Sequence, residues 1–205
     1  MLSLPEANVR GRRFAMGSVS CLCTLGILAI LLGCPPSNGG VTVPNTDPTP
    51  PSITLGFALE GSSPVSGTVS VGGQTQTITL PQKTGKLSLL ATGTDPDSGI
   101  QSVGIFMEAD SQTCTSQGTC SGSLAHGLWS TPNFVSNSGK KNPGDTASPN
   151  SVLAESVDLT TLIKTSPVNP GDTVTTKIWV MGQAQNQLNA TSQTAEGVAM
   201  FVEKK

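Results

Sequence analysis

The chain has 205 residues, of which only 12% are charged and 3% aromatic. Its 23 glycines and 15 prolines favour strands and turns over long helices. Residues 34–205 carry 8 lysines against 12 acidic residues, and no aromatic side chains alternate with the lysines, which argues against a nucleic-acid-binding surface.

The first segment has the features of an export signal. Arg10, Arg12 and Arg13 precede an uncharged run over residues 14–33, whose apolar residues are densest from 25 to 32. A basic start followed by an apolar run is typical of a secretory signal peptide. Serine and threonine dilute the run below the roughly 20 apolar residues that a membrane-spanning helix needs. We therefore predict a signal peptide over residues 1–33.

The end of that segment, Leu31-Leu32-Gly33-Cys34, resembles the lipobox of bacterial lipoproteins. The resemblance implies cleavage before Cys34, diacylglycerol on its sulfur and acylation of the new amino terminus. Each buried acyl CH₂ contributes about 0.8 kcal/mol, so two or three chains make a permanent membrane anchor. Pro35 after the cysteine implies, by the same resemblance, the outer membrane and an extracytoplasmic domain of the cell envelope. The alternative is an uncleaved anchor that ends in a cysteine by chance.

Residues 34–51 contain six prolines and little apolar sequence, so we expect an extended, solvated linker. Beyond it, alternation with a period of two predicts strands. The first covers Ile53 to Leu59, and Gly72-Gly73 is expected to close a two-residue hairpin between Val69 and Leu80. Further strands are expected at 87–92, 103–107, 152–159, 174–181 and 198–202, with one helical turn at 160–163.

Several short strands separated by turns, without alternating helices, predict an all-β antiparallel sandwich over residues 52–205. Two stretches, Ala91 to Met107 and Asn169 to Ser192, resemble the immunoglobulin-like and fibronectin-type-III-like modules of bacterial surface proteins. The resemblance implies an immunoglobulin-like β-sandwich after the signal peptide and the Pro-rich linker. The chain has no tyrosine, so the tyrosine corner of such folds is missing.

Cys114 and Cys120 are the cysteines that remain after Cys34 is lipidated and Cys21 and Cys23 leave with the signal. Outside the cytoplasm we expect a disulfide between them. A zinc site would need His126 and a fourth ligand at a spacing unlike zinc motifs.

Carboxylates occur in two close pairs, Asp95 with Asp97 and Glu108 with Asp110. Asp95 and Asp97 are weak calcium candidates, since the remaining acidic residues of a calcium loop are missing. They are better explained as turn-formers, whose side chains cap backbone N–H groups while Gly99 takes a positive φ. No cofactor is expected beyond the lipid on Cys34.

The segment from 110 to 150 is predicted to be a long loop, far longer than the usual 4–6 residues, and long loops on rigid sandwiches often bind partners. Its binding candidates are His126, Trp129, Phe134, Lys140 and Lys141. The alternative is that Leu128, Trp129 and Phe134 form a strand or lie against the sandwich, which leaves only residues 136–149 as a disordered tip. His126 is the only histidine and has no nucleophile motif beside it, and no phosphate-binding glycine loop indicates a nucleotide.

The leading hypothesis is a membrane-anchored lipoprotein whose immunoglobulin-like domain binds or scaffolds an unknown protein or glycan without catalysis. An envelope hydrolase or enzyme subunit is the first alternative, and a structural stalk or assembly component is the second. No nucleic-acid or nucleotide partner is expected.

Overall fold

The fold is seen in a computed structural model that describes residues 39–60 and 66–205. The predicted signal peptide, Cys34 and the linker up to residue 38 lie outside the described residues. In chain order the elements are β1 (Val41–Thr42), β2 (Ser52–Leu59), β3 (Ser66–Ser70), β4 (Gln76–Thr79), β5 (Lys86–Thr94), β6 (Ile100–Cys114), β7 (Cys120–Gly122), β8 (Phe134–Asn137), β9 (Thr146–Ala147), β10 (Asn150–Asp158), α1 (Leu159–Leu162), β11 (Thr173–Asn186), β12 (Thr191–Gln193) and β13 (Gly197–Lys204).

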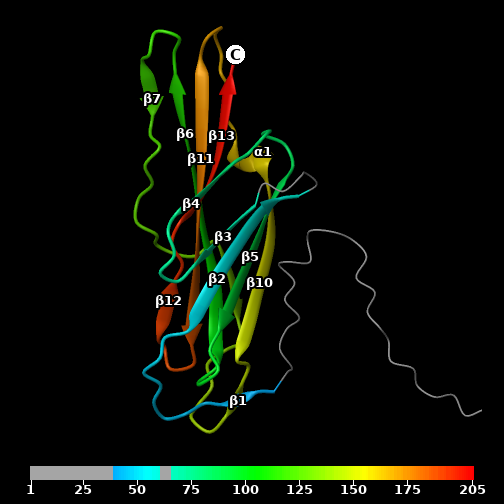
Figure 1. Cartoon of the computed structure of the whole chain (residues 1–205), viewed down its shortest axis with the longest axis vertical. Coiled ribbons are helices and arrows are strands. Elements are labelled where there is room, and N and C mark those ends of the chain that lie inside the picture. Colours follow the sequence, from blue (N-terminus) through cyan, green and yellow to red (C-terminus); the bar gives the residue numbers. More distant parts are fainter. Residues whose placement is uncertain (1–38, 61–65) are drawn as a thin grey trace, which may run out of the picture.

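Two sheets lie face to face and form a β-sandwich (Figure 1), which confirms the predicted all-β fold. The four-stranded sheet has the order β10-β5-β2-β3. The seven-stranded sheet has the order β4-β13-β11-β6-β7, with β12 beside β11 and β8 beside β6. A short third sheet of β1 and β9 closes the lower end of the molecule in Figure 1, and the C-terminus lies at the upper end.

The hydrophobic core fills the space between the sheets because both sheets turn alternate apolar residues inward. In β2 the alternation places Ile53, Leu55 and Phe57 inside, each at most 1% exposed. From the other sheet, β11 contributes Ile178 and Val180, both fully buried. Burial of each such side chain contributes about 1.5–3 kcal/mol, so these facing rows stabilise the sandwich.

The predicted hairpin at Gly72-Gly73 is wrong, although a turn is present and Gly72 has a φ of 71°. β3 pairs with β2 in one sheet, whereas β4 pairs with β13 in the other. The β4–β13 pair is parallel, in contrast to the antiparallel pairing predicted for the sandwich. Sequence alternation predicts that a segment forms a strand, but it does not predict which strand lies beside it. At the free edge of β3, the Gln76 side chain accepts a hydrogen bond from the Thr68 N–H.

The linker expected to be solvated is folded onto the domain over part of its length. Val41 and Thr42 form β1, which pairs with β9, and Val43 is only 1% exposed. The Val43 N–H donates to the Asp145 carbonyl at 2.9 Å. A Val-Thr-Val stretch is long enough to pair with a short strand, and burying one valine side chain favours this.

Part of the segment from 110 to 150, predicted to be one long loop, forms strands. β6 continues to Cys114, and β7 and β8 both pair with β6 within the segment. The predicted Cys114–Cys120 disulfide is present, with the two Cα atoms 4.0 Å apart at the β6–β7 turn. Phe134, the first residue of β8, lies against the core.

The predicted helical turn is present as α1, where the Asp158 side chain accepts from the Thr160 N–H. None of the helices among the described residues has the length and apolar character needed to cross a bilayer.

Candidate functional site

The outer face of the seven-stranded sheet carries a second group of buried apolar side chains, separate from the core. Phe106 on β6, Trp179 and Met181 on β11, and Val198 on β13 are 4–7% exposed. Antiparallel register places Trp179 directly opposite Val198 and Met181 directly opposite Phe106. Apolar side chains on an outer face stay out of water only if another element covers them.

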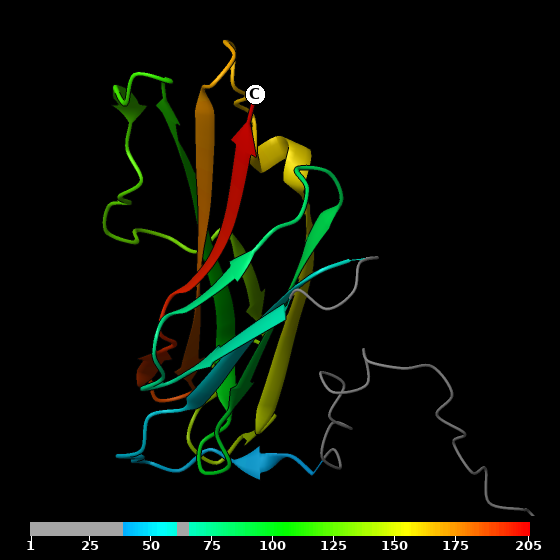
Figure 2. The same ribbon diagram turned by 45° about the horizontal axis from the view of Figure 1, so that its top comes forward.

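The covering element is segment 123–133, which leaves β7 and returns to β8. Both strands pair with β6, so the segment begins and ends beside this strand and extends along the outer side of the seven-stranded sheet (Figure 2). Asn133 fixes its end, because its N–H donates to the Ile105 carbonyl at 2.8 Å and its side-chain oxygen accepts from the Met107 N–H at 2.5 Å.

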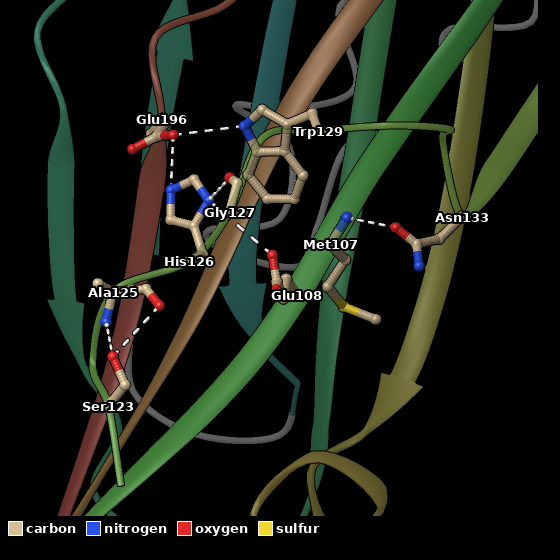
Figure 3. A network of polar contacts seen from close by, with 9 residues as sticks. All are labelled: Met107, Glu108, Ser123, Ala125, His126, Gly127, Trp129, Asn133 and Glu196. Carbon is tan, nitrogen blue, oxygen red and sulfur yellow. Dashed lines mark hydrogen bonds and ion pairs between the residues drawn. The ribbon is translucent and has the colours of Figure 1, made fainter.

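The middle of the segment is held by the side chains of His126 and Trp129 (Figure 3). His126 Nε2 lies 2.8 Å from a carboxylate oxygen of Glu196, which precedes β13, and Nδ1 lies 2.7 Å from the carbonyl of Gly127. The Trp129 indole N–H donates to the same Glu196 oxygen at 3.3 Å. Glu108 on β6 lies 3.9 Å from His126 Nδ1.

The imidazole ring of His126 contacts both tryptophans of the chain. Its centroid lies 4.8 Å from Trp129 with a tilt of 37°, and 5.0 Å from Trp179 with a tilt of 52°. The Trp129 ring also lies 5.8 Å from Phe106. We call His126, Trp129, Trp179, Glu108 and Glu196 the outer-face site.

Both ring nitrogens of His126 face oxygen atoms that accept hydrogen bonds, a carboxylate oxygen of Glu196 and the carbonyl oxygen of Gly127. The side chain of His126 is 14% exposed, while those of Glu196 and Glu108 are 36% and 43% exposed. The site therefore holds a planar imidazole ring between aromatic rings and partly exposed carboxylates.

The five predicted binding residues do not gather in one place. His126 and Trp129 lie in the outer-face site, and Phe134 contacts the core. Lys140 and Lys141 are exposed in the β8–β9 connection, where the Lys141 N–H donates to the side chain of Gln187 at 2.6 Å. Of the three residues in the alternative, Trp129 and Phe134 lie against the sandwich, whereas Leu128 is fully exposed.

Sequence reasoning missed three members of the outer-face site. Trp179 is expected on the face of β11 opposite to the core row, but nothing local predicts that segment 123–133 covers it. Glu108 alternates with core residues of β6, and this alternation could have placed it on the outer face beside Trp179. Glu196 has no local signal, because its approach to His126 depends on the sandwich topology.

Asp95 belongs to a second polar arrangement, at the end of the sandwich that carries β1. Its Oδ1 accepts from the N–H groups of Asp97 and Ser98 at 3.0 and 2.8 Å, and its Oδ2 from the Ser98 hydroxyl at 3.2 Å and the Asn186 side-chain amide at 3.0 Å. Gly99 completes the turn with a φ of 81°. These four donors occupy the carboxylate of Asp95, as expected of a turn-former. Asp97 is exposed and accepts no described hydrogen bond.

Asn186 and Gln187 connect this turn to two other segments. The Asn186 side-chain oxygen accepts from the Leu188 and Ala190 N–H groups at 3.0 and 2.9 Å. The Gln187 side-chain amide donates to the carbonyls of Ile100 and Gly139 at 3.2 and 3.1 Å. We call Asp95, Ser98, Asn186 and Gln187, each at most 2% exposed, the polar hub.

Protein-family models, curated proteins and solved structures give no match to this chain. Among residues 39–60 and 66–205, no three or more histidine, cysteine or acidic side chains are grouped so that they could hold a metal ion.

Proposed function

We propose that the chain is a lipid-anchored protein of the bacterial envelope, whose sandwich binds a partner through the outer-face site without catalysing a reaction. The observation that carries this is the gathering of both tryptophans and the only histidine on one outer sheet face. Tryptophan is enriched among the residues that dominate binding energies, and this chain has no tyrosine to take that role.

The strand order supports an immunoglobulin-like assignment. In that fold, strands A, B, E and D form one sheet and C, F and G the other. The neighbours β2-β5-β10 correspond in chain order to A-B-E, and β6-β11-β13 to C-F-G. β3 beside β2 and the parallel β4 beside β13 are additions to this scheme. Sandwiches of this type serve many functions, so the binding role rests on the site.

The contacts of His126 favour binding over hydrolysis. A histidine that acts as a general base needs one nitrogen facing the group that it deprotonates. Here Glu196 and the Gly127 carbonyl face the two nitrogens, and no described serine or threonine hydroxyl shares a hydrogen bond with the ring.

The anchor rests on the Leu31 to Cys34 sequence and is tested by expressing the full chain in a bacterium. The wild-type protein is expected in the membrane fraction with a mass that matches cleavage before Cys34 and acylation. Cys34→Ser should remain uncleaved and lose the acyl mass. A Cys34→Ser protein that is still cleaved and still acylated would contradict the proposal.

Partner binding is tested with a photo-crosslinking amino acid at Leu128, which is fully exposed beside Trp129 and makes no contact in the site. In envelopes of the source bacterium, Leu128 should give a discrete crosslinked product, identified by mass spectrometry. The matched control is Val168, which is 70% exposed in the connection between α1 and β11. Equal labelling from both positions, or none from Leu128, would contradict binding at the outer-face site.

A further inference from the structure

The outer-face site already contains a planar hydrogen-bonding group, which the chain itself supplies. The ring of His126 lies beside the Glu196 carboxylate and the Gly127 carbonyl and contacts Trp129 and Trp179. Aromatic faces attract cations, most strongly when the aromatic residue is tryptophan. Two tryptophans and a carboxylate around one planar group form a receptor for a planar cation.

Two carboxylates face the ring of His126. Glu196 and Glu108 lie 2.8 and 3.9 Å from the two ring nitrogens, and among the described residues no lysine forms an ion pair with either carboxylate. The site is therefore acidic and can accept a cation. Both glutamate side chains are also partly exposed, so a ligand can reach them from solvent.

His126 can leave without breaking a sheet. Within segment 123–133, the described backbone hydrogen bonds to the sheet involve only Asn133 at its end. His126 and Trp129 hold the middle through their bonds to Glu196. Displacement of the imidazole thus costs side-chain contacts, while the pairing of β6 with β7 and β8 stays intact.

We propose that the outer-face site receives an arginine side chain of a partner protein, and that His126 occupies the place of this arginine in the free protein. A guanidinium is planar and permanently charged, stacks on aromatic faces and presents its N–H donors in the plane of the group. It matches the ring of His126 in planarity and can bond both carboxylates at once. The ammonium of lysine shares the charge but is not planar.

Residues 34–205 do not supply the arginine, so the proposal assigns it to a partner. The chain has arginines only at positions 10, 12 and 13, within the predicted signal peptide, and none from residue 34 to 205. The inference rests on the proposed function, because a partner has to present the side chain. The chemistry of the site can nevertheless be tested without the partner.

The test uses the purified full-length lipoprotein in detergent, titrated with N-acetyl-arginine amide and followed by tryptophan fluorescence. N-acetyl-citrulline amide is the matched neutral probe, and N-acetyl-lysine amide the non-planar cation. His126→Ala removes the competing ring and is expected to bind the arginine probe about tenfold more tightly than wild type, a change that lies between the contributions of an exposed and a desolvated cation–π contact. The citrulline probe is expected not to bind.

Charge variants separate the site from general electrostatics. In the His126→Ala background, Glu196→Gln should weaken binding of the arginine probe about tenfold. Glu155→Gln removes a carboxylate from β10 in the other sheet and should leave binding unchanged.

The proposal is wrong if His126→Ala keeps the wild-type circular dichroism yet binds the arginine probe no better than citrulline, or binds lysine equally well. If His126→Ala does not fold, His126→Gln retains one hydrogen-bonding group and should bind the arginine probe more tightly than wild type. Equal binding by a folded His126→Gln would also overturn the proposal. If Leu128 gives a crosslinked product but the site does not select the arginine probe, the arginine proposal is wrong and the proposed binding role stands. If the site selects the arginine probe but Leu128 gives no crosslinked product, the proposed partner binding is wrong.

Discussion

The polar hub and the outer-face site both collect polar side chains, but they differ in what surrounds them. Asp95, Asn186 and Gln187 are at most 2% exposed, and each makes several hydrogen bonds to backbone or side-chain groups. In the outer-face site His126 is 14% exposed, and its neighbours Glu108 and Glu196 are 43% and 36% exposed. The hub joins three segments of the fold, whereas the outer-face site holds one segment onto a finished sheet.

This difference separates a structural network from the proposed binding site. A buried polar group without a partner costs roughly 1–3 kcal/mol, so a hub with its bonds satisfied stabilises a single arrangement of the segments it joins. A partly exposed contact is screened and replaceable, because water or a ligand can substitute for either partner. The two regions should therefore respond differently to the same kind of truncation.

Asn186→Ala should have the largest effect. It removes the amide donor to Asp95 and leaves the N–H groups of Leu188 and Ala190 without their acceptor. We expect the free energy of unfolding to fall by about 3 kcal/mol, measured by denaturant titration. Asn45→Ala, at an exposed asparagine, is the matched control and should change it by less than about 0.5 kcal/mol. A loss below 1 kcal/mol would show that the hub does not stabilise the fold.

His126→Ala should have a smaller and more local effect. We expect the free energy of unfolding to fall by about 1 kcal/mol, since the lost contact with Glu196 is partly exposed. Protease cleavage within segment 123–133 should rise much more than global unfolding does. Lys140→Ala, an exposed lysine from the same predicted loop, should change neither property. Global unfolding as large as that of Asn186→Ala would place His126 in the structural network instead.

The smallest effect on stability is expected for the hydrogen bonds of Glu60, which lies on an exposed surface of the four-stranded sheet. The hydroxyls of Ser156 and Ser88 donate to its carboxylate, each at 2.9 Å, and hold the pKa of Glu60 below its usual value. Because the pKa of Glu60 is lower in the folded protein, its ionised carboxylate stabilises the fold. This stabilisation is fully present above the pKa of about 4.3 in the unfolded chain and is lost as the pH falls through the pKa of the folded protein. Ser156→Ala should raise the pKa of Glu60, measured by carboxyl NMR titration. Thr54→Ala on the same sheet face should leave it unchanged, and equal shifts in both variants would refute the role of the hydroxyl.

The fold could be predicted as far as local patterns decide it. Period-two alternation predicted β2, β5, β10 and β11, because each turns one row of apolar side chains toward the core. The Asp95 to Gly99 turn followed from side-chain capping and a positive φ. The pairing of β4 with β13 and of β1 with β9 could not be predicted, since strand neighbours depend on the whole topology.

The candidate site was predictable only in part. His126 and Trp129 are conspicuous in a chain with few aromatic residues, so their rarity alone pointed to them. Their contact with Trp179 and Glu196 joins positions that lie 50 or more residues apart in sequence, and no local pattern encodes it. Local sequence also does not predict that Lys140 and Lys141 lie away from the site. They follow β8, which leads toward the end of the sandwich that carries β1.

Native-state hydrogen exchange compares the two regions most directly. The N–H groups of Ser98 and Leu188, which donate to hub side chains, should exchange only through global unfolding, with opening free energies that fall steeply as denaturant is added. The indole N–H of Trp129 should exchange through a smaller, local opening that is nearly independent of denaturant. It should also exchange more readily, relative to its intrinsic rate, in His126→Ala. Equal opening free energies for Trp129 and the hub would contradict the account, because segment 123–133 would then belong to the cooperative core and could not release His126 to a ligand.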